Sequence, residues 1–281
     1  MVERSSHYVH GTDGEEQARL TRLNDLLNAG TLRELALQPG EKILDVGAGL
    51  GQLSRAMARA VGRGGKVIGV ERSAAQIAEA ERQARAAGEA LLVDLRRGDA
   101  RDPPLTGAEW GTFDVAHARF VLEHVPDPEA VVATMVRAVR PGGRVVLADD
   151  DHDVFRTWPE PPSLRAVWQA YCQSYRTAGN DPYVGRRLPE LLHAAGASPR
   201  RCTWIFFGAC AGDPAFPLLV ENLATILAQA AAPLAKEGVT PGDLARATSE
   251  VRALSGRPGA AIWYGMSYAE GVKLGAPARA P

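Results

Sequence analysis

The chain has 281 residues, a formal net charge of −1 and 46% hydrophobic residues, which suits one large domain or a core domain with an elaboration. A charge so close to neutral gives no electrostatic footprint for nucleic acid or anionic lipid. The three cysteines lack metal-type spacing, no apolar run is long enough to span a bilayer, and the N-terminus is too polar for a signal peptide. The composition therefore predicts a cytoplasmic protein without nucleic-acid or membrane partners.

Helix and strand signals alternate through the first half of the chain. Capping patterns at Asp13 and Thr31 predict two helices, separated at Gly30, the second ending near Pro39. Short apolar runs between turn residues predict strands. These are EKILDV, GKVIGVE, ALLVDLRRGD, TFDVAHA and GRVVLAD, with helices predicted between them over 52–61, 73–88 and 127–140. Strands that alternate with helices imply βαβ units and a doubly wound α/β sheet, in which the strand ends line one crevice.

The second half of the chain is less regular. The Pro-rich stretch WPEPP (158–162) is expected to precede an aromatic helix around Trp168, and 186–195 to form a further helix. RRCTWIFFG and AIWYGMSYAEG are expected to be strands, and the Ala- and Leu-rich residues between them, 214–255, two helices. The predicted organisation is an N-terminal helical lid over 1–40, a core over 41–152, and a helical cap over 153–281 that also supplies the closing strands.

Three glycines at alternate positions follow the first strand, in ILDVGAGLGQLS (43–54). Such glycines bring bare backbone close to a nucleotide, whereas a turn that only needs positive φ rarely requires three of them. The dinucleotide pattern GxGxxG is not met, because Gln52 stands where its third glycine belongs. No GK[ST] follows, which excludes a phosphate-binding P-loop. The stretch indicates a nucleotide site of another kind.

Two acids end the neighbouring strands. Glu71 closes the second strand about twenty residues beyond the glycines, where a carboxylate accepts hydrogen bonds from both ribose hydroxyls. Asp99, in the GDA that follows the third strand, can receive an adenine amino group or serve as a turn residue ahead of Pro103. By themselves these two acids still allow NAD.

Taken together, these residues resemble the class I S-adenosylmethionine-dependent methyltransferases, in their small-molecule, ubiquinone-biosynthesis-like branch. The matching stretches lie in the family's order over roughly residues 40–150. They are DVGAGLG (45–51), Glu71, GDA (98–100), FDVAHARFVLEHVPDP (113–128) and PGGRVV (141–146). The resemblance implies a Rossmann-like sheet of seven strands with the last one antiparallel, and S-adenosylmethionine as the cofactor.

The resemblance also implies which residues hold the cofactor. Gly47 and Gly49 would let the backbone approach its methionine part, and Asp45 would organise the loop or reach the methionine amine through water. Arg119 would pair with the methionine carboxylate, although an exposed structural arginine is the alternative. Tyr8 would fold over the cofactor or have no role. The full implied set is Tyr8, Asp45, Gly47, Gly49, Glu71, Asp99, Ala100, His117 and Arg119.

Two histidines near the predicted strand ends are candidate bases. His124, in LEHV, is a catalytic candidate or a structural histidine. His152, in LADDDHD, is expected to act with Asp150 as a base pair or as a polar contact to substrate, with a solvated acidic loop as the alternative. Since alternate residues of an extended segment point in opposite directions, Asp149 and Asp151 should face away from that pair. Three acids and a histidine in 149–153 raise a metal site as a second possibility, which stays open; no metal ligand is predicted, because one face would supply only two ligands and divalent oxygen sites want more.

The predicted reaction is in-line displacement, in which a methyl group moves to an O, N or C atom of a small molecule. The aromatic and aliphatic residues of the cap favour a largely apolar substrate. One alternative is a cyclase-like enzyme that keeps the cofactor without net methyl transfer. A more distant one is a NAD-dependent oxidoreductase, which Gln52 disfavours, and a binding-only protein is less favoured still. The sequence leaves the acceptor atom and the oligomeric state open.

Overall fold

The computed structural model describes residues 14–275, apart from the side chains of residues 14–23 and 26. Tyr8 and Asp13 therefore lie outside the described residues. The chain divides into two compact units. The sheet unit comprises Gly30–Phe155, Tyr175–Phe206 and Gly265–Pro281, and the helical unit comprises Met1–Ala29, Arg156–Ser174 and Phe207–Tyr264.

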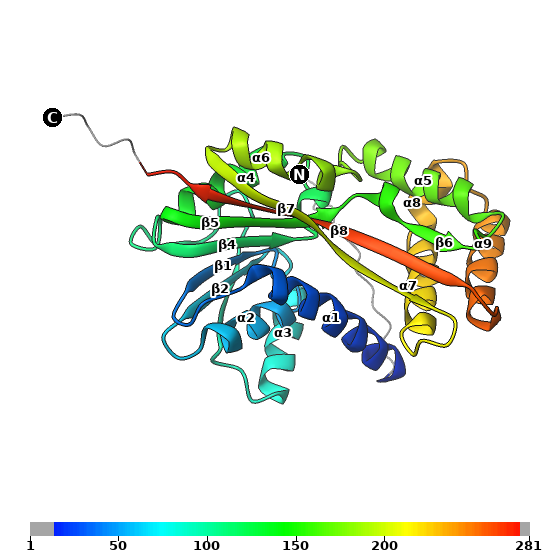
Figure 1. Ribbon diagram of the computed structural model, residues 1–281, viewed down its shortest axis with the longest axis horizontal. Coiled ribbons are helices and arrows are strands. Elements are labelled where there is room, and N and C mark those ends of the chain that lie inside the picture. The colour runs from blue at the N-terminus through cyan, green and yellow to red at the C-terminus, as the bar shows by residue number, and fades with distance from the viewer. Residues whose placement is uncertain (1–13, 276–281) are drawn as a thin grey trace. The chain divides into compact units, whose positions relative to one another are not determined.

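The sheet unit is built on parallel strands that pair in a doubly wound order (Figure 1). Across the sheet these are β3 (Val93–Arg97), β2 (Lys66–Glu71), β1 (Lys42–Val46), β4 (Phe113–Arg119) and β5 (Val139–Asp150). The last strand of the chain, β8 (Ala261–Lys273), lies antiparallel to β5, with Asp150 opposite Met266, and also pairs with β7 (Ala197–Cys210). This arrangement confirms the predicted α/β sheet and its antiparallel last strand.

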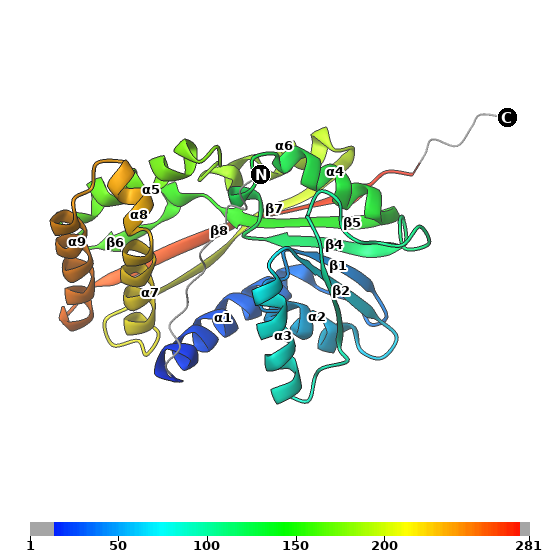
Figure 2. The ribbon, with the colours of Figure 1, turned by 180° about the vertical axis from the view of Figure 1, so that it is seen from behind.

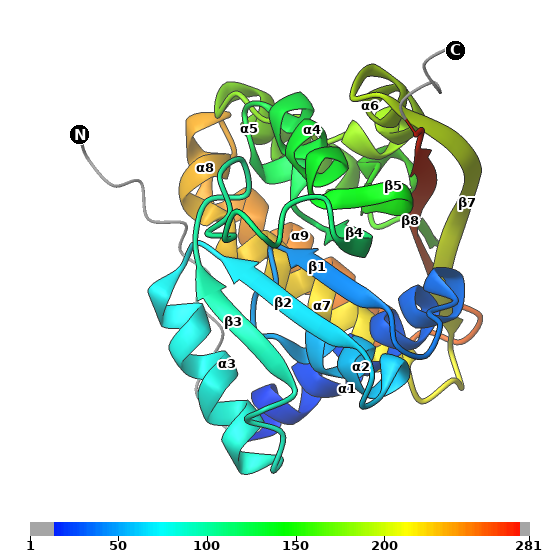
Figure 3. The ribbon, with the colours of Figure 1, turned by 90° about the vertical axis from the view of Figure 1, so that its left-hand side faces the viewer.

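Helices cover both faces of this sheet (Figure 3). On one face lie α2 (Gln52–Val61) and α3 (Ala74–Ala86), and on the other α4 (Pro128–Ala138) and α6 (Leu188–Ala194). Two of the predicted caps are confirmed, because Ser73 accepts a hydrogen bond from the Gln76 amide at 3.3 Å and Asp127 one from the Ala130 amide at 3.0 Å. The core consists of buried aliphatic residues from β1, β2, β4 and β5 packed against α4 and α6.

The prediction of two separate N-terminal helices is wrong. One helix, α1 (Gly14–Leu35), runs without a break through Gly30 and Thr31. A Cβ atom at Gly30 would lie 2.8 Å from Cγ2 of Ile205 in β7. The glycine therefore allows the close approach of a strand and does not end the helix.

The helical unit contains part of α5 (Leu164–Thr177) together with α7 (Phe216–Gln229), α8 (Ala231–Lys236) and α9 (Pro241–Ala253). Residues 214–255 thus form three helices and not the predicted two, with α7 beside α9 (Figure 2). A short strand, β6 (Arg156–Trp158), pairs antiparallel with the beginning of β8. No helix among residues 14–275 is long and apolar enough to cross a membrane.

Candidate functional site

The glycine loop after β1 has a backbone that only glycine adopts without strain. Gly47, Gly49 and Gly51 have φ values of 73°, 53° and 67°, all in the left-handed region. A Cβ atom at Gly47 would also lie 2.3 Å from Cγ2 of Val121, which follows β4. The loop therefore exposes backbone in place of side chains, and it lies directly against the segment that leaves β4.

Replacing Gly47 with alanine is expected to lower the free energy of unfolding by about 2–4 kcal/mol, because left-handed strain adds to a steric clash. The matched control is Gly88→Ala, which has a similar φ of 69° and no atom within 4 Å of the added Cβ. The control should lose only the strain term, about 1–2 kcal/mol. Urea unfolding of both variants measures the difference, and equal losses would contradict the proposed contact with Val121.

Glu71, at the end of β2, holds three turns together. Its Oε2 accepts a hydrogen bond from the Gly49 amide at 3.1 Å, and its Oε1 one from the Ser73 amide at 2.7 Å. Its backbone carbonyl accepts a bond from the Gly98 amide, at the end of β3, at 3.0 Å. The carboxylate thus lies beside the glycine loop, at the strand end where the sequence predicted it.

Asp45 lies beneath the loop and accepts two side-chain hydrogen bonds. One comes from the hydroxyl of Ser54 in α2, and the other joins Oδ1 to Nδ1 of His117 in β4 at 2.8 Å. The His117 ring is completely buried, and its Nε2 has no hydrogen-bond partner among the described residues. Asp45 therefore ties α2 and β4 to the end of β1, and any influence of His117 on a bound ligand passes through Asp45.

Asp99 and Arg119 already have protein partners. The Asp99 carboxylate accepts a hydrogen bond from the Arg101 amide at 2.8 Å and pairs with the guanidinium of the same residue at 3.0 Å. That pairing holds the pKa of Asp99 below its usual value. Arg119 donates to the hydroxyl of Thr31 in α1 at 3.0 Å. Ala100 packs against the core.

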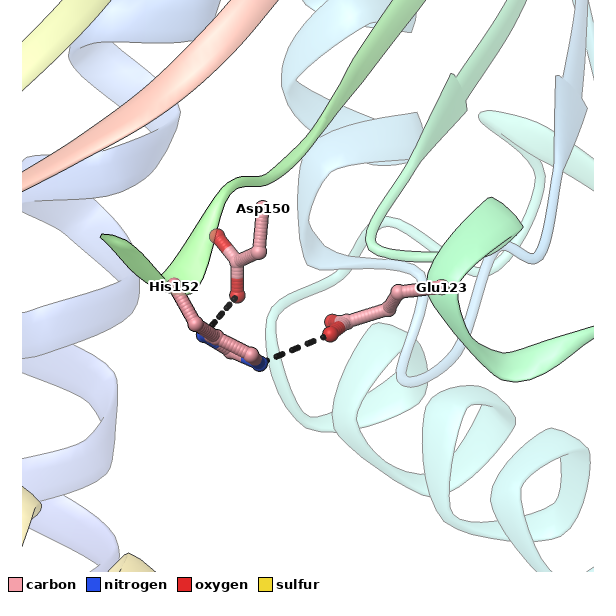
Figure 4. Close-up of side chains that lie close together, drawn as sticks. All are labelled: Glu123, Asp150 and His152. Carbon is pink, nitrogen blue, oxygen red and sulfur yellow. Dashed lines mark ion pairs between the residues drawn. The ribbon is translucent and has the colours of Figure 1, made fainter. Parts of the chain in front are cut away.

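A buried cluster of three carboxylates and one imidazole lies at the carboxyl ends of β4 and β5. We call Glu123, Asp149, Asp150 and His152 the carboxylate–histidine cluster; at most 7% of each residue is exposed. Nε2 of His152 lies 3.2 Å from Oε2 of Glu123, and Nδ1 lies 4.0 Å from Oδ2 of Asp150 (Figure 4). The structure thus brings together the predicted Asp150 and His152 and adds Glu123, which the sequence interpretation missed.

The alternation predicted for the acidic segment does not hold throughout, because Asp149 belongs to the cluster and the extended backbone ends where η2 (His152–Val154) begins. Asp149 accepts hydrogen bonds from the amides of Val121 and Leu122, at 3.0 and 2.8 Å, and so fixes the turn after β4. Asp151 pairs with the guanidinium of Arg186, whose Nε lies 2.7 Å from its Oδ2. Asp149 therefore holds the turn that leads to Glu123, and Asp151 is engaged by Arg186.

Burial and charge act in opposite directions on two members of the cluster. Burial alone would lower the pKa of His152, but the contact with Glu123 and the nearby Asp150 raise it above its usual value. Burial alone would raise the pKa of Glu123, but His124 and His152 lower it. The pKa of Asp149 is raised by burial and by the nearby carboxylates of Glu123 and Asp150.

His124 borders the cluster, and its side chain is 48% exposed. It belongs to the short helix η1 (Leu122–His124), and its Nε2 lies 3.4 Å from Oε1 of Glu123. Its ring stacks on Tyr175 with the centroids 5.7 Å apart, while the His152 ring meets the same tyrosine edge-on at 5.4 Å. Tyr175 and Glu123 thus contact both candidate histidines and link them.

Gly185, in the short helix η3 (Val184–Arg187), supports the end of β5 from outside. A Cβ atom there would lie 2.7 Å from the carbonyl oxygen of Asp150 and 2.8 Å from that of Asp149. We expect Gly185→Ala to lower the free energy of unfolding by about 1–3 kcal/mol, because the backbone of the cluster would have to move. The control is Gly107→Ala, whose Cβ would meet nothing within 4 Å. Thermal unfolding that shows no difference between the two variants would contradict this packing.

The comparison with known protein families decides what kind of chain this is. The family described as a methyltransferase domain matches residues 18–200, which is more than half of the chain. The chain belongs to this methyltransferase family. Membership confirms the resemblance drawn from the glycine loop and the strand ends, and S-adenosylmethionine is the methyl donor that goes with it.

Two curated relatives of this chain have names that include a quinone. The 2-phytyl-1,4-naphtoquinone methyltransferase of Synechococcus elongatus is 34% identical over 157 residues, 53% of this chain and 64% of the relative. The ubiquinone biosynthesis O-methyltransferase of Hahella chejuensis is 36% identical over 130 residues, 46% of this chain and 52% of the relative. The matches thus cover less than two thirds of either relative's length.

The methyltransferase fold is also found among solved structures. A geranyl diphosphate methyltransferase in complex with S-adenosylmethionine superposes with a TM-score of 0.57 at 20% sequence identity. The match covers 94% of this chain and 92% of the other. At this identity the likeness shows the fold alone.

Proposed function

We propose that the chain transfers a methyl group from S-adenosylmethionine to an O, N or C atom of a largely apolar small molecule. The observation that carries the proposal is the loop of left-handed glycines, Gly47 and Gly49 among them, with the Glu71 carboxylate bonded to the Gly49 amide. Bare backbone beside an acid at the end of the second strand is the arrangement that receives a nucleoside at the switch point of an α/β sheet.

Each cofactor residue has a proposed task. An ionised carboxylate has about four lone-pair sites. Glu71 uses two of them for the Gly49 and Ser73 amides and keeps the others for the ribose hydroxyls. Asp99 would share its carboxylate between Arg101 and the adenine amino group, and the Ala100 amide would face the adenine ring. In the same proposal Arg119 pairs with the methionine carboxylate, and Tyr8 with the rest of the N-terminal lid covers the cofactor.

In this proposal the carboxylate–histidine cluster serves the methyl acceptor. Val121 contacts Gly47 on one side, and on the other its amide bonds to Asp149 within the cluster, so the cluster adjoins the glycine loop. When a hydroxyl attacks the sulfonium methyl carbon, the C–O bond forms, the C–S bond breaks, and the hydroxyl proton must leave. We propose that His152, with Asp150 and with His124 at the cluster's edge, receives that proton.

The acceptor we propose is an aromatic hydroxyl or a hydroquinone on an apolar molecule. Two relatives carry quinone names, and the helical unit presents stacked aromatic rings, with Trp168 and Tyr171 at 5.2 Å. The cap over 153–281 would then contact the apolar part of the substrate. A cytoplasmic location completes the proposal.

Incubation with S-adenosylmethionine labelled on its methyl group, together with a panel of hydroquinones, phenols and terpenoid alcohols, tests this function. We expect label to appear in an extractable apolar product, with S-adenosylhomocysteine as the second product. A converted substrate that carries no label would overturn methyl transfer and favour the cyclase-like alternative. Heat-inactivated protein is the control.

A further inference from the structure

The cluster contains a set of side chains suited to a metal ion. One oxygen of Glu123, one oxygen of Asp150 and one ring nitrogen of His152 all lie within 4.8 Å of one another. Figure 4 shows the three side chains converging from η1, from the end of β5 and from the short helix η2 (His152–Val154). Neighbouring ligands at about 2.1 Å from one ion lie about 3–3.5 Å apart, so the side chains would have to close by about 1 Å, through side-chain rotation, to complete the site.

A second observation points to a ligand at this place. The Glu123 side chain is 4% exposed, and its Oε2 accepts no hydrogen bond from any residue in the described part of the chain, although Nε2 of His152 is 3.2 Å away. A buried carboxylate oxygen without a donor carries a high desolvation cost, which a cation offsets. In Figure 4 a dashed line joins this carboxylate to Nε2 of His152, and a second one joins Asp150 to Nδ1 of the same ring.

The chemistry of the donors selects the class of cation. We infer that Glu123, Asp150 and His152 form a binding site for one divalent transition-metal ion of the kind that accepts mixed oxygen and nitrogen ligands, such as Mn²⁺, Fe²⁺ or Zn²⁺. Imidazole favours these ions over Mg²⁺ and Ca²⁺, and two carboxylates suit them better than Cu⁺. Three protein ligands leave a coordination position open, as in catalytic and not structural sites.

Neighbouring residues hold the ligands in place. Asp149 fixes η1, which carries Glu123, by accepting the amides of Val121 and Leu122. The amide of His152 donates to the carbonyl of Pro182 at 3.2 Å, which fixes the start of η2. Such supporting contacts keep ligands aimed at one point and raise metal affinity.

The inference goes beyond the proposed function. A bound cation would itself favour the deprotonated acceptor, and the role of His152 as a base then applies to the protein without the ion. Binding of the ion requires neither the cofactor nor a methyl acceptor. The proposed metal site and the proposed methyl transfer can therefore be disproved independently, because each has its own experiment.

The test is titration of the metal-free full chain with Mn²⁺, followed by electron paramagnetic resonance of the free ion. We expect one bound Mn²⁺ per chain and displacement by Zn²⁺. The variants Glu123→Gln and Asp150→Asn should each weaken binding by about 100-fold or more. The matched control Asp153→Asn, an exposed acid of the same segment, should leave affinity unchanged.

Circular dichroism establishes that each variant is folded before binding is compared. If Glu123→Gln does not fold, the test relies on Asp150→Asn and on a nuclear magnetic resonance measurement of the unmodified protein. In the unmodified protein, one equivalent of Mn²⁺ should broaden the ring proton resonances of His152 and spare those of His193 on α6. Absence of stoichiometric binding, equal binding by the unmodified chain and both variants, or equal broadening of the two histidines would overturn the inference.

Discussion

Replacing Glu71 with alanine is expected to weaken the binding of S-adenosylhomocysteine by about 100-fold. Hydrogen bonds to a charged group contribute about 1.5–3 kcal/mol each, and the variant loses those proposed to the ribose hydroxyls. It also releases the amides of Gly49 and Ser73, which the carboxylate now holds. Isothermal titration calorimetry measures the change, and circular dichroism should show an intact fold.

Two further variants separate the carboxylate's charge from the side chain's presence. Glu71→Gln keeps one acceptor oxygen and should bind with intermediate affinity. Glu79→Ala, on the exposed face of α3, removes an acid paired with Arg82 and should bind as the unmodified protein does. If Glu71→Ala bound the ligand within threefold of the unmodified protein, the ribose assignment would be wrong.

Replacing His152 with alanine is expected to lower turnover by about 10²–10⁴-fold, the usual contribution of a positioned general base. Affinity for the cofactor should change little, because the contacts proposed for the cofactor lie at the glycine loop and Glu71. The measurement is single-turnover methyl transfer with the best acceptor from the labelled screen, beside calorimetry with S-adenosylhomocysteine.

Stability has to be controlled in this experiment, because the imidazole lies beside the buried Glu123 and Asp150 carboxylates. Removing one partner of a buried ion pair costs about 3–5 kcal/mol, so activity should be measured well below the variant's own melting temperature. His193→Ala, on α6, is the matched histidine control. Unchanged turnover in folded His152→Ala would show that the cluster takes no part in the reaction.

Local signals in the sequence were enough to predict most of the sheet unit. The strands β1, β2 and β4 coincide with short apolar runs, and α3 and α4 start at Ser73 and Asp127, where capping residues were predicted. These features depend on neighbours a few residues apart, so a linear pattern reveals them.

Features that depend on tertiary contacts were not predictable in this way. Gly30 looks like a helix end. Its lack of a side chain instead leaves room for the side chain of Ile205, which is far away in the sequence. Glu123 precedes His152 by almost thirty positions and meets it only because β4 and β5 are neighbours in the sheet. The signal for Glu123 was present, since acids at the ends of adjacent parallel strands share one edge, but spacing alone cannot pair them.

We propose that S-adenosylmethionine binds at the loop of left-handed glycines. Calorimetric titration of the full chain with S-adenosylhomocysteine and, separately, with NAD tests it most directly. We expect one S-adenosylhomocysteine to bind per chain and Glu71→Ala to weaken that binding. NAD should give no heat of binding. Binding of NAD without binding of S-adenosylhomocysteine would contradict it.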